Sequence, residues 1–387
     1  MNTLLRAPDV DLITALEQVV SQRASDLHVT TDSIPMLRID GTLQPTESIG
    51  LWMEAKCTSA LFSILTPAQR EVFDRDLELD FSYMLEDGTR FRVNFYQQQG
   101  TVGGAFRIIP TIIEPLAKLG IPESVGAFSQ LPRGLVLITG PTGSGKSTTI
   151  AALIDLINCT RADHIVTIED PVEFLHRHKR SIINQREVGF DTHSFAAALK
   201  HVLRQDPDVI LIGELRDLET MSVALTAAET GHLVFASLHT QDAAQTIDRI
   251  IDVFPPHQQA QVRSQLAATL RGVVCQTLIK RASGKGRVVA SEILVSTPAI
   301  ANLIREGKTY QIVSMMQAGR AQGMNTMDQN LAELVKSGAI EYQAAVGRAH
   351  DLESLTSLLV GFDPKVDNSR RMNGAIYYGD AFSTQVR

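Results

Sequence analysis

Glycine, serine and lysine residues between positions 140 and 149 have the composition of a phosphate-binding loop. The run reads GPTGSGKSTT and contains the spacing GxxxxGK[ST]. Glycines let successive backbone N–H groups turn toward an anion without a clash from Cβ. In this pattern the Lys146 amine reaches the β- and γ-phosphates, and the Ser147 hydroxyl coordinates Mg²⁺. We therefore expect ATP and Mg²⁺ as cofactors, bound by Gly140, Pro141, Thr142, Gly143, Ser144, Gly145, Lys146, Ser147 and Thr148.

The flanks of this loop predict the two elements that hold it. Residues 134–139 form a short apolar run with β-branched side chains, which is typical of a strand buried on both faces. After Lys146, apolar residues recur at helical spacing, at Ile150, Leu153, Ile154 and Ile157. A chance match to the loop pattern is the alternative, but a chance match is not expected to have a strand pattern before it and a helix pattern after it. The order of strand, glycine loop and helix favours a phosphate site at the positive end of a helix dipole.

Carboxylates follow the next two predicted strands. Residues 164–168 are followed by a segment that contains Glu173, and residues 209–212 are followed by Gly213 and Glu214. Ligands of open α/β sheets bind at this carboxyl edge. Phosphoryl transfer to water needs one carboxylate to orient the water and another to fix the Mg²⁺ shell. We assign the first role to Glu173 and the second to Glu214, so the metal site combines Ser147 with Glu214. Solvated loop acids are the alternative.

Two histidines flank a third predicted strand, residues 233–237. His232 precedes this strand and His239 follows it, so the two should lie at opposite ends of it. Only His239 falls on the ligand-binding edge, where it can sense the γ-phosphate. We therefore add His239 to the catalytic candidates, with an ordinary surface histidine as the alternative.

The first 110 residues have the pattern of a small α+β domain. We predict a helix over 10–23, a hairpin that turns near Asp40 and Gly41, helices over 52–65 and from Thr66 onward, and strands over 77–83, 89–96 and 101–109. Arg92 and Arg107 lie on the last two of these strands and can present two guanidinium groups to one anionic target. A solvated strand face would also explain them.

Proline and glycine mark the boundary between two domains. Residues 111–128 contain Pro115, Gly120 and Pro122, which indicate a linker or hinge. The large α/β domain with a C-terminal helical segment is expected over 129–350, and residues 351–387 form a C-terminal extension that we expect to be mobile.

Charge and cysteine content narrow the function classes. Residues 1–115 hold 9 basic and 16 acidic side chains, whereas the remainder holds 27 of each. The nucleotide-binding part has no basic excess, which argues against nucleic acid as a partner. The cysteines Cys57, Cys159 and Cys275 are scattered singly, so we expect buried thiols rather than disulfides or a metal site. There is no run typical of a membrane span or a signal peptide, so we expect a cytoplasmic protein.

Four motifs together resemble the secretion ATPases of type II secretion and type IV pili. They are the loop at 140–149, TIEDPVEF at 167–174, ILIGELRDLET at 210–220 and TGHLVFASLHT at 230–240. In this family they are the Walker A motif, the aspartate box, an atypical Walker B motif with Gly213 where other P-loop enzymes carry aspartate, and the histidine box. The resemblance covers about residues 3–350. It implies a RecA-like P-loop ATPase domain preceded by a small PAS-like α+β domain.

The resemblance also implies residue roles and partners. It makes Glu173 the catalytic glutamate, Glu214 the Walker B acid and His239 a histidine-box residue. Arg92, in the RFR run that begins at Arg90, and Arg107 resemble arginines that reach phosphates across domain or subunit boundaries. Family members form homohexameric rings that act on a pilus platform protein at the cytoplasmic face of the inner membrane, and other pilus ATPases are further possible partners.

The pattern favours the retraction-motor branch of this family, in which ATP hydrolysis drives pilin disassembly and twitching motility. Assembly ATPases commonly carry a four-cysteine metal site, and three lone cysteines cannot build one. Ala301 departs from the retraction pattern, because it stands in PAIANLIRE where the family has arginine. An accessory retraction ATPase, a type II or type IV secretion ATPase, a scaffold that binds ATP without hydrolysing it, and a DNA translocase remain the alternatives.

Overall fold

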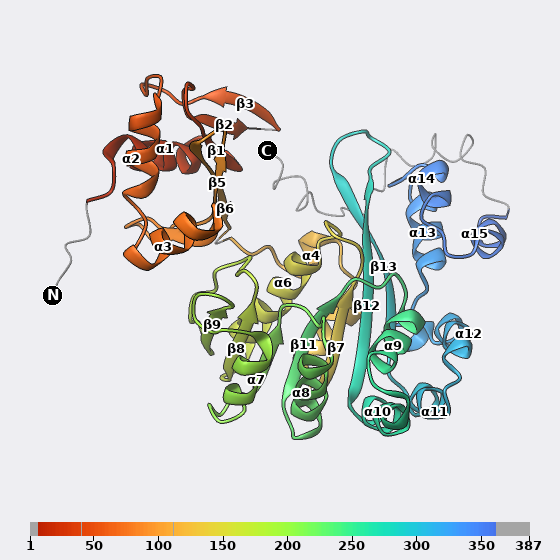
Figure 1. Cartoon of the computed structure of the whole chain (residues 1–387). Coiled ribbons are helices and arrows are strands. Elements are labelled where there is room, and N and C mark those ends of the chain that lie inside the picture. The colour runs from red at the N-terminus through yellow and green to blue at the C-terminus, as the bar shows by residue number, and fades with distance from the viewer. Residues whose placement is uncertain (1–6, 40, 111, 361–387) are drawn as a thin grey trace. The chain divides into compact units, whose positions relative to one another are not determined.

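The chain divides after residue 111 into two compact units. The computed structural model describes residues 7–39, 41–110 and 112–360. The first unit contains the helices α1 (Val10–Ser21), α2 (Glu54–Phe62) and α3 (Pro67–Asp76) and the strands β1 (Asp26–Val29), β2 (Met36–Ile39), β3 (Thr42–Pro45), β4 (Glu78–Met84), β5 (Arg90–Gln98) and β6 (Thr101–Ile109). These strands form one sheet in the order β3-β2-β1-β6-β5-β4 (Figure 1).

Local sequence signals explain the helix starts of this unit. Thr66 caps α3 in a capping box with Gln69, and Pro67 occupies the first helical position. The Asp9 side chain caps α1. The helices cover an apolar core in which Trp52, Phe91 and Phe106 are fully buried. The predicted α+β domain is therefore present. The predicted hairpin is seen in the pairing of Ile39 with Thr42, although Asp40 lies outside the described residues.

The second unit is built on a seven-stranded sheet in the order β13-β12-β7-β11-β10-β8-β9. All neighbouring strands are parallel except β12 and β13, which pair antiparallel. The strands are β7 (Gly134–Thr139), β8 (His164–Glu169), β9 (Ile182–Glu187), β10 (Val209–Ile212), β11 (Leu233–Leu238), β12 (Leu270–Lys280) and β13 (Arg287–Val295). Strand β7 is buried along its whole length, as its apolar sequence predicts.

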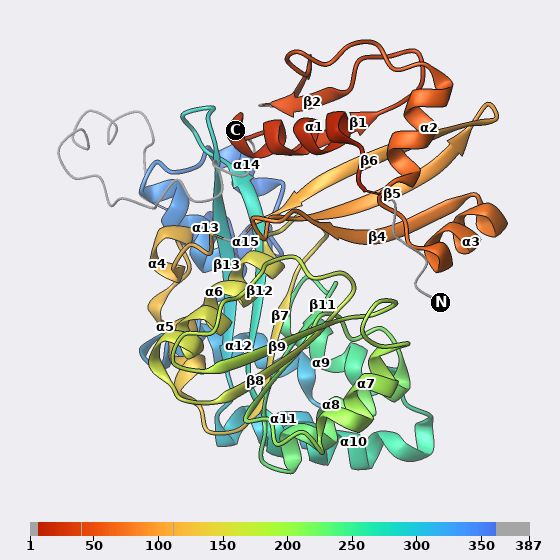
Figure 2. The ribbon, with the colours of Figure 1, turned by 90° about the vertical axis from the view of Figure 1, so that its left-hand side faces the viewer.

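Helices cover both faces of this sheet (Figures 1 and 2). The helices are α4 (Leu116–Leu119), α5 (Glu123–Gly126), α6 (Lys146–Thr160), α7 (Phe195–Val202), α8 (Leu218–Glu229), α9 (Ala243–Asp252), α10 (Pro256–Thr269), α11 (Pro298–Glu306), α12 (Ile312–Ala318), α13 (Met327–Lys336), α14 (Tyr342–Val346) and α15 (Leu352–Leu358). Apolar residues of α6 share one core with α4 and α5, whereas those of α7 to α10 share a second core on the opposite face. A third cluster joins β12 and β13 to α13, α14 and α15.

Residues 111–128 do more than connect the units. Leu119, Ile121 and Val125 of this segment are buried in the core of the second unit, next to α6. The part of the predicted linker from Leu119 onward therefore belongs to the core of the second unit. At the other end, Leu355 of α15 is buried against α13, and residues 361–387 of the predicted extension lie outside the described part of the chain.

One prediction about the cysteines is wrong. Cys57 and Cys275 are buried as expected, but Cys159 is exposed. It lies in the last turn of α6 on the solvent side, where the Lys179 amine donates a hydrogen bond to its sulfur at 3.4 Å. Within the described residues, no helix is both long enough and apolar enough to cross a membrane.

Candidate active site

The loop between β7 and α6 forms a cradle of backbone N–H groups. Gly140, Gly143 and Gly145 have φ values of 136°, 76° and 88°, a region that favours glycine. A Cβ built at Gly140 would lie 2.2 Å from the carbonyl oxygen of Gln276 on β12, so no larger residue fits. Gly145 is the N-cap residue of α6, and it has no side chain that could accept a hydrogen bond from the first N–H groups of the helix. The first N–H groups of α6 therefore have no side-chain cap and point outward from the positive end of the helix dipole.

Side chains around this cradle suit a phosphate group. The buried Lys146 amine donates to the carbonyl oxygens of Gly140 at 2.8 Å and Pro141 at 3.2 Å, so it lies over the loop. Burial lowers the pKa of Lys146, and the charge of Glu214 partly opposes this effect. Ser147 is exposed beside it. The Ser144 hydroxyl is buried without a hydrogen-bond partner among the described residues. A buried cation, free N–H groups and an unpaired hydroxyl fit a nucleotide phosphate.

Strand order brings the predicted acids to the same edge. Strand β10 pairs with β8 and β11, and β11 pairs with β7, so their carboxyl ends lie next to the phosphate loop. Glu214 follows β10 and forms an ion pair of 2.8 Å with Arg216 and a contact of 3.3 Å with the His239 Nε2. Burial acts to raise the pKa of Glu214, but the hydrogen bonds and charges of Arg216 and His239 outweigh burial and lower it. Glu214 is thus held ionised beside His239.

Gly213 explains why the acid follows the strand instead of ending it. Its N–H donates to the carbonyl oxygen of Ile168 at 2.7 Å, which draws β10 close to β8. A Cβ built at Gly213 would lie 3.2 Å from the Cα of Glu169 and 3.3 Å from the Ile168 oxygen. Those distances are tighter than nine in ten real Cβ contacts, so a side chain at position 213 would require the backbone of β8 to shift by a few tenths of an ångström.

The end of β8 and the turn after it place one glutamate inside the protein and one outside. The Glu169 carboxylate is buried and accepts hydrogen bonds from the Thr167 hydroxyl at 2.6 Å and the Gln185 amide at 3.2 Å. Burial raises the pKa of Glu169, and these hydrogen bonds oppose the increase. The N–H of Glu173 also reaches the Glu169 carboxylate, at 3.5 Å, while the Glu173 side chain is exposed. Glu169 therefore anchors the turn that presents Glu173 to solvent.

The two histidines lie at opposite ends of β11, as their spacing predicts. His239 contacts Glu214 at the carboxyl edge. The His232 Nδ1 lies 3.0 Å from the carbonyl oxygen of Ala227 at the other edge, so that ring helps to fix the end of α8. Of the pair, His239 alone belongs to the candidate site.

In the first unit, Arg92 and Arg107 are direct neighbours. They pair across β5 and β6, so their side chains lie on the same face of that sheet. Arg107 donates to the Asp26 carboxylate at 2.8 Å and is 70% exposed. The exposed Arg92 side chain has no hydrogen bond or ion pair with the described residues. Two adjacent guanidinium groups, of which only Arg107 is paired with a carboxylate, can accept a further anion.

The sequence reasoning missed Gln276, and it assigned no role to Glu169 of the TIEDPVEF motif. The Gln276 amide donates to the carbonyl oxygen of Ser144 at 2.8 Å and so supports the phosphate loop from β12. Both residues are polar positions inside apolar runs that the fold buries. That pattern is visible in the sequence, but the partner of each side chain depends on strand order.

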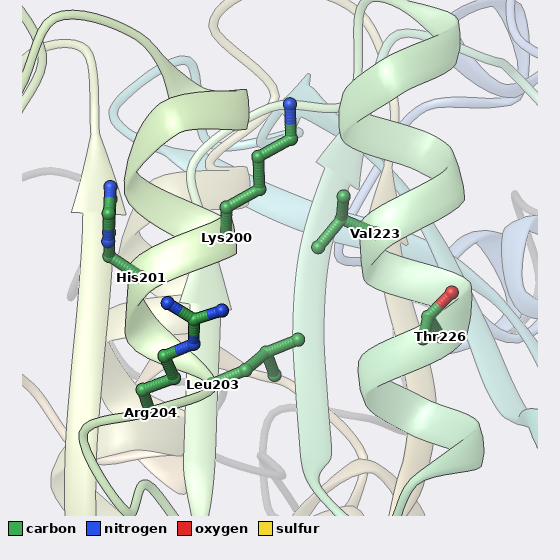
Figure 3. Close-up of a pocket in the computed structure, with 6 residues that line it drawn as sticks. All are labelled: Lys200, His201, Leu203, Arg204, Val223 and Thr226. Atoms are coloured by element: carbon green, nitrogen blue, oxygen red, sulfur yellow. The ribbon is translucent and has the colours of Figure 1, made fainter.

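A separate groove of about 460 Å³ lies between α7 and α8 and is lined by Lys200, His201, Leu203, Arg204, Val223 and Thr226 (Figure 3). Its α7 residues lie at the end of that helix that leads back to the start of β10. The groove is therefore at the opposite edge of the sheet from the acids, and it plays no part in the candidate site.

Comparisons with known proteins agree with this geometry. Residues 116–351 match the family of type II/IV secretion system proteins. The chain is 49% identical over 341 residues to the type IV pilus retraction ATPase PilT of Pseudomonas aeruginosa, covering 88% of this chain and 98% of that protein. It is 39% identical over 344 residues to the type IV pilus ATPase PilU of the same organism, covering 89% and 90%.

A solved structure has the same fold. The crystal structure of the pilus retraction motor PilT with bound ADP aligns with a TM-score of 0.83 at 45% sequence identity, covering 88% of this chain and 98% of that one. The predicted fold class is confirmed: an α/β, RecA-like P-loop domain preceded by a small α+β domain.

Proposed function

Because the chain belongs to the family of type II/IV secretion system proteins, we propose that it is an ATPase motor that drives type IV pilus retraction. One observation carries the proposal: the uncapped start of α6, with Lys146 over it, lies at the sheet edge where Glu214 and His239 meet. The identity to the PilT relative, higher than that to the PilU relative, favours a primary over an accessory retraction motor.

The nucleotide phosphates bind to the N–H groups of the loop and of the first turn of α6. Lys146 turns its amine from the loop carbonyls to the β- and γ-phosphates, which replaces two neutral acceptors with charged ones. Ser147 would hold Mg²⁺ directly and Glu214 would hold its water shell, and the ion would supply positive charge to neutralise the phosphates.

Each acid at the edge has a separate task. Glu173 is exposed on the turn that Glu169 anchors, so it is free to orient the attacking water and accept its proton. Glu214 stays ionised because Arg216 and His239 lower its pKa. His239 contacts Glu214 directly, so it responds when the γ-phosphate enters or leaves.

Assembly completes the site. Arg92 and Arg107 are adjacent and exposed, and we assign them to a phosphate bound by a neighbouring copy. A homohexameric ring with ATP between subunits makes hydrolysis depend on that contact. The ring acts on a membrane-embedded platform protein at the cytoplasmic face of the inner membrane, and movement about the residues before α4 transmits the stroke.

Two experiments test this function. Purified Lys146→Ala protein should lose ATPase activity, because the γ-phosphate loses its cation; substantial retained activity would contradict the assignment of the loop. Deletion of the gene should leave cells that carry surface pili and do not twitch. Loss of pili would indicate assembly instead, and normal twitching with altered force would indicate an accessory motor.

A further inference from the structure

A row of buried polar side chains crosses three strands of the second unit. Thr139, Cys275 and Glu292 are direct neighbours on β7, β12 and β13, so their side chains lie on one face of the sheet. The Thr139 hydroxyl donates to the Cys275 sulfur at 2.8 Å. Thr139 is also the residue before the phosphate loop. The row therefore begins at the nucleotide site and ends at Glu292.

Glu292 accepts hydrogen bonds from the first residues of two different helices. Its Oε1 accepts from the N–H of Ala243 in α9 at 2.8 Å, and its Oε2 accepts from the N–H of Met327 in α13 at 3.2 Å. The His350 Nδ1 lies 3.7 Å from the same Oε2. The glutamate is 4% exposed. Burying a carboxylate is costly, and apolar residues of similar size often serve stability as well. A buried carboxylate shared by two helices is better explained by a positioning role.

Helix α9, one of the two helices whose first N–H group donates to Glu292, begins shortly after the histidine box at 230–240. His239 lies four residues before α9, and the Asp242 side chain caps that helix. The hydroxyls of Thr240 and Thr246 lie 2.6 Å apart, and the Thr246 hydroxyl donates to the Asp242 carbonyl oxygen at 2.7 Å. These bonds tie Thr240 and Asp242 to the first turn of α9. The chain directly after His239 is therefore fixed to the N–H group that donates to Glu292.

Helix α13, the other helix whose first N–H group donates to Glu292, is hydrogen-bonded to the start of α15. Thr326 caps α13 in a capping box, directly before Met327. The buried Asp328 carboxylate accepts from the N–H groups of His350 at 2.9 Å and Asp351 at 3.1 Å. Asp351 in turn caps α15. Glu292 thus holds the start of α13, and Asp328 of α13 holds the residues that lead into α15.

We infer that Glu292 is a positioning residue that couples the nucleotide state sensed by residues 239–242 to the C-terminal helices α13 and α15. The inference rests on the proposed ATP site and extends it, because it names the route by which that site reaches a distant part of the same unit. When the γ-phosphate draws His239, the start of α9 shifts, and the Glu292 carboxylate carries α13 with it. The route is a pair of hydrogen bonds to one side chain, so a single substitution can break it.

Hydrogen exchange on the full chain, with and without a non-hydrolysable ATP analogue and Mg²⁺, tests the coupling. In the wild type, nucleotide should slow exchange at residues 143–148, at the start of α9 and in residues 327–336. A coupling free energy of typical size changes the exchange rate of residues 327–336 about 5- to 150-fold. In Glu292→Gln the phosphate loop should still respond, while the response of residues 327–336 falls below about twofold.

Two further variants make the result specific. Ala243→Pro removes the N–H donor of α9 at a position that tolerates proline, so it breaks the same link from the other side and should have the same effect. Asp328→Asn disturbs α13 and α15 without touching α9, so it should keep the response. A full response in both Glu292→Gln and Ala243→Pro, or an equal loss in Asp328→Asn, would overturn the inference. A wild-type loop that shows no protection would remove the proposed function, and the inference with it.

Discussion

Gln276 offers a quantitative test of how the phosphate loop is held. The side chain is 1% exposed, and its amide donates to the Ser144 carbonyl oxygen at 2.8 Å. Gln276→Met keeps a similar volume but has no donor. Because Ser144 is itself 2% exposed, its carbonyl oxygen then loses that donor in a site that water reaches poorly. A buried polar group left unpaired costs about 1–3 kcal/mol.

This free-energy cost destabilises the conformation of the phosphate loop that binds nucleotide. The dissociation constant of a fluorescent ATP analogue should therefore rise about 5- to 150-fold, which is the same free energy expressed as affinity. Thr277→Val is the matched control, because Thr277 is the next residue of β12, is nearly buried and faces the opposite side of the sheet. Equilibrium titration and thermal melting should be measured on both variants. Affinity within twofold of the wild type for Gln276→Met, with an unchanged melting temperature, would refute the reasoning.

Two further predictions concern the candidate site, and a third concerns the buried His176. Glu173→Gln should leave nucleotide binding intact and lower the ATPase rate by about 10²- to 10⁴-fold, because the water loses its base; if Glu214→Gln did this and Glu173→Gln did nothing, the two roles would be exchanged. Arg92→Ala should lower the ATPase rate of the assembled protein without lowering its melting temperature, since Arg92 is exposed and unpaired within the described residues; an unchanged rate would return it to a solvated strand face. Burial lowers the pKa of His176 from 6.5 to about 4, so its stabilising effect is complete above pH 6.5 and is lost as the pH falls toward 4. Urea melts at pH 7 and pH 4 should differ by roughly 3 kcal/mol from this source, and that part of the difference should vanish in His176→Gln; equal pH dependence in both proteins would contradict the assignment.

The parts of the fold that the sequence predicts are those with local signals. Strands β6 and β7 have the predicted bounds, because alternation or a short apolar run between turn residues defines them. Thr66 and Pro67 mark the start of α3 for a similar reason. The neighbouring positions of Arg92 and Arg107 were also predictable, because a tight turn between consecutive strands fixes their register.

The rest depends on contacts between distant parts of the chain. Gln276 reaches the phosphate loop only because β12 pairs with β7, and no local pattern predicts that pairing. The same strand order places Glu292 beside two helix starts. Cys159 was expected to be buried because free cysteines usually are, but its orientation depends on which face of α6 packs against the sheet. The short helices within residues 111–128 were hidden by their prolines, which here precede the helices instead of preventing them.

The contact at Gly213 limits how the sequence of this motor can change over evolution. Aspartate at that position would need wider spacing between two central strands, and such a shift would disturb the buried hydrogen bonds around Glu169. The acid that we propose for the metal site, Glu214, stands one residue later and beyond the strand. Glycine at position 213 of this motif therefore fits the close packing of β10 against β8. An engineer who restores aspartate at position 213 should first look for substitutions that loosen β8.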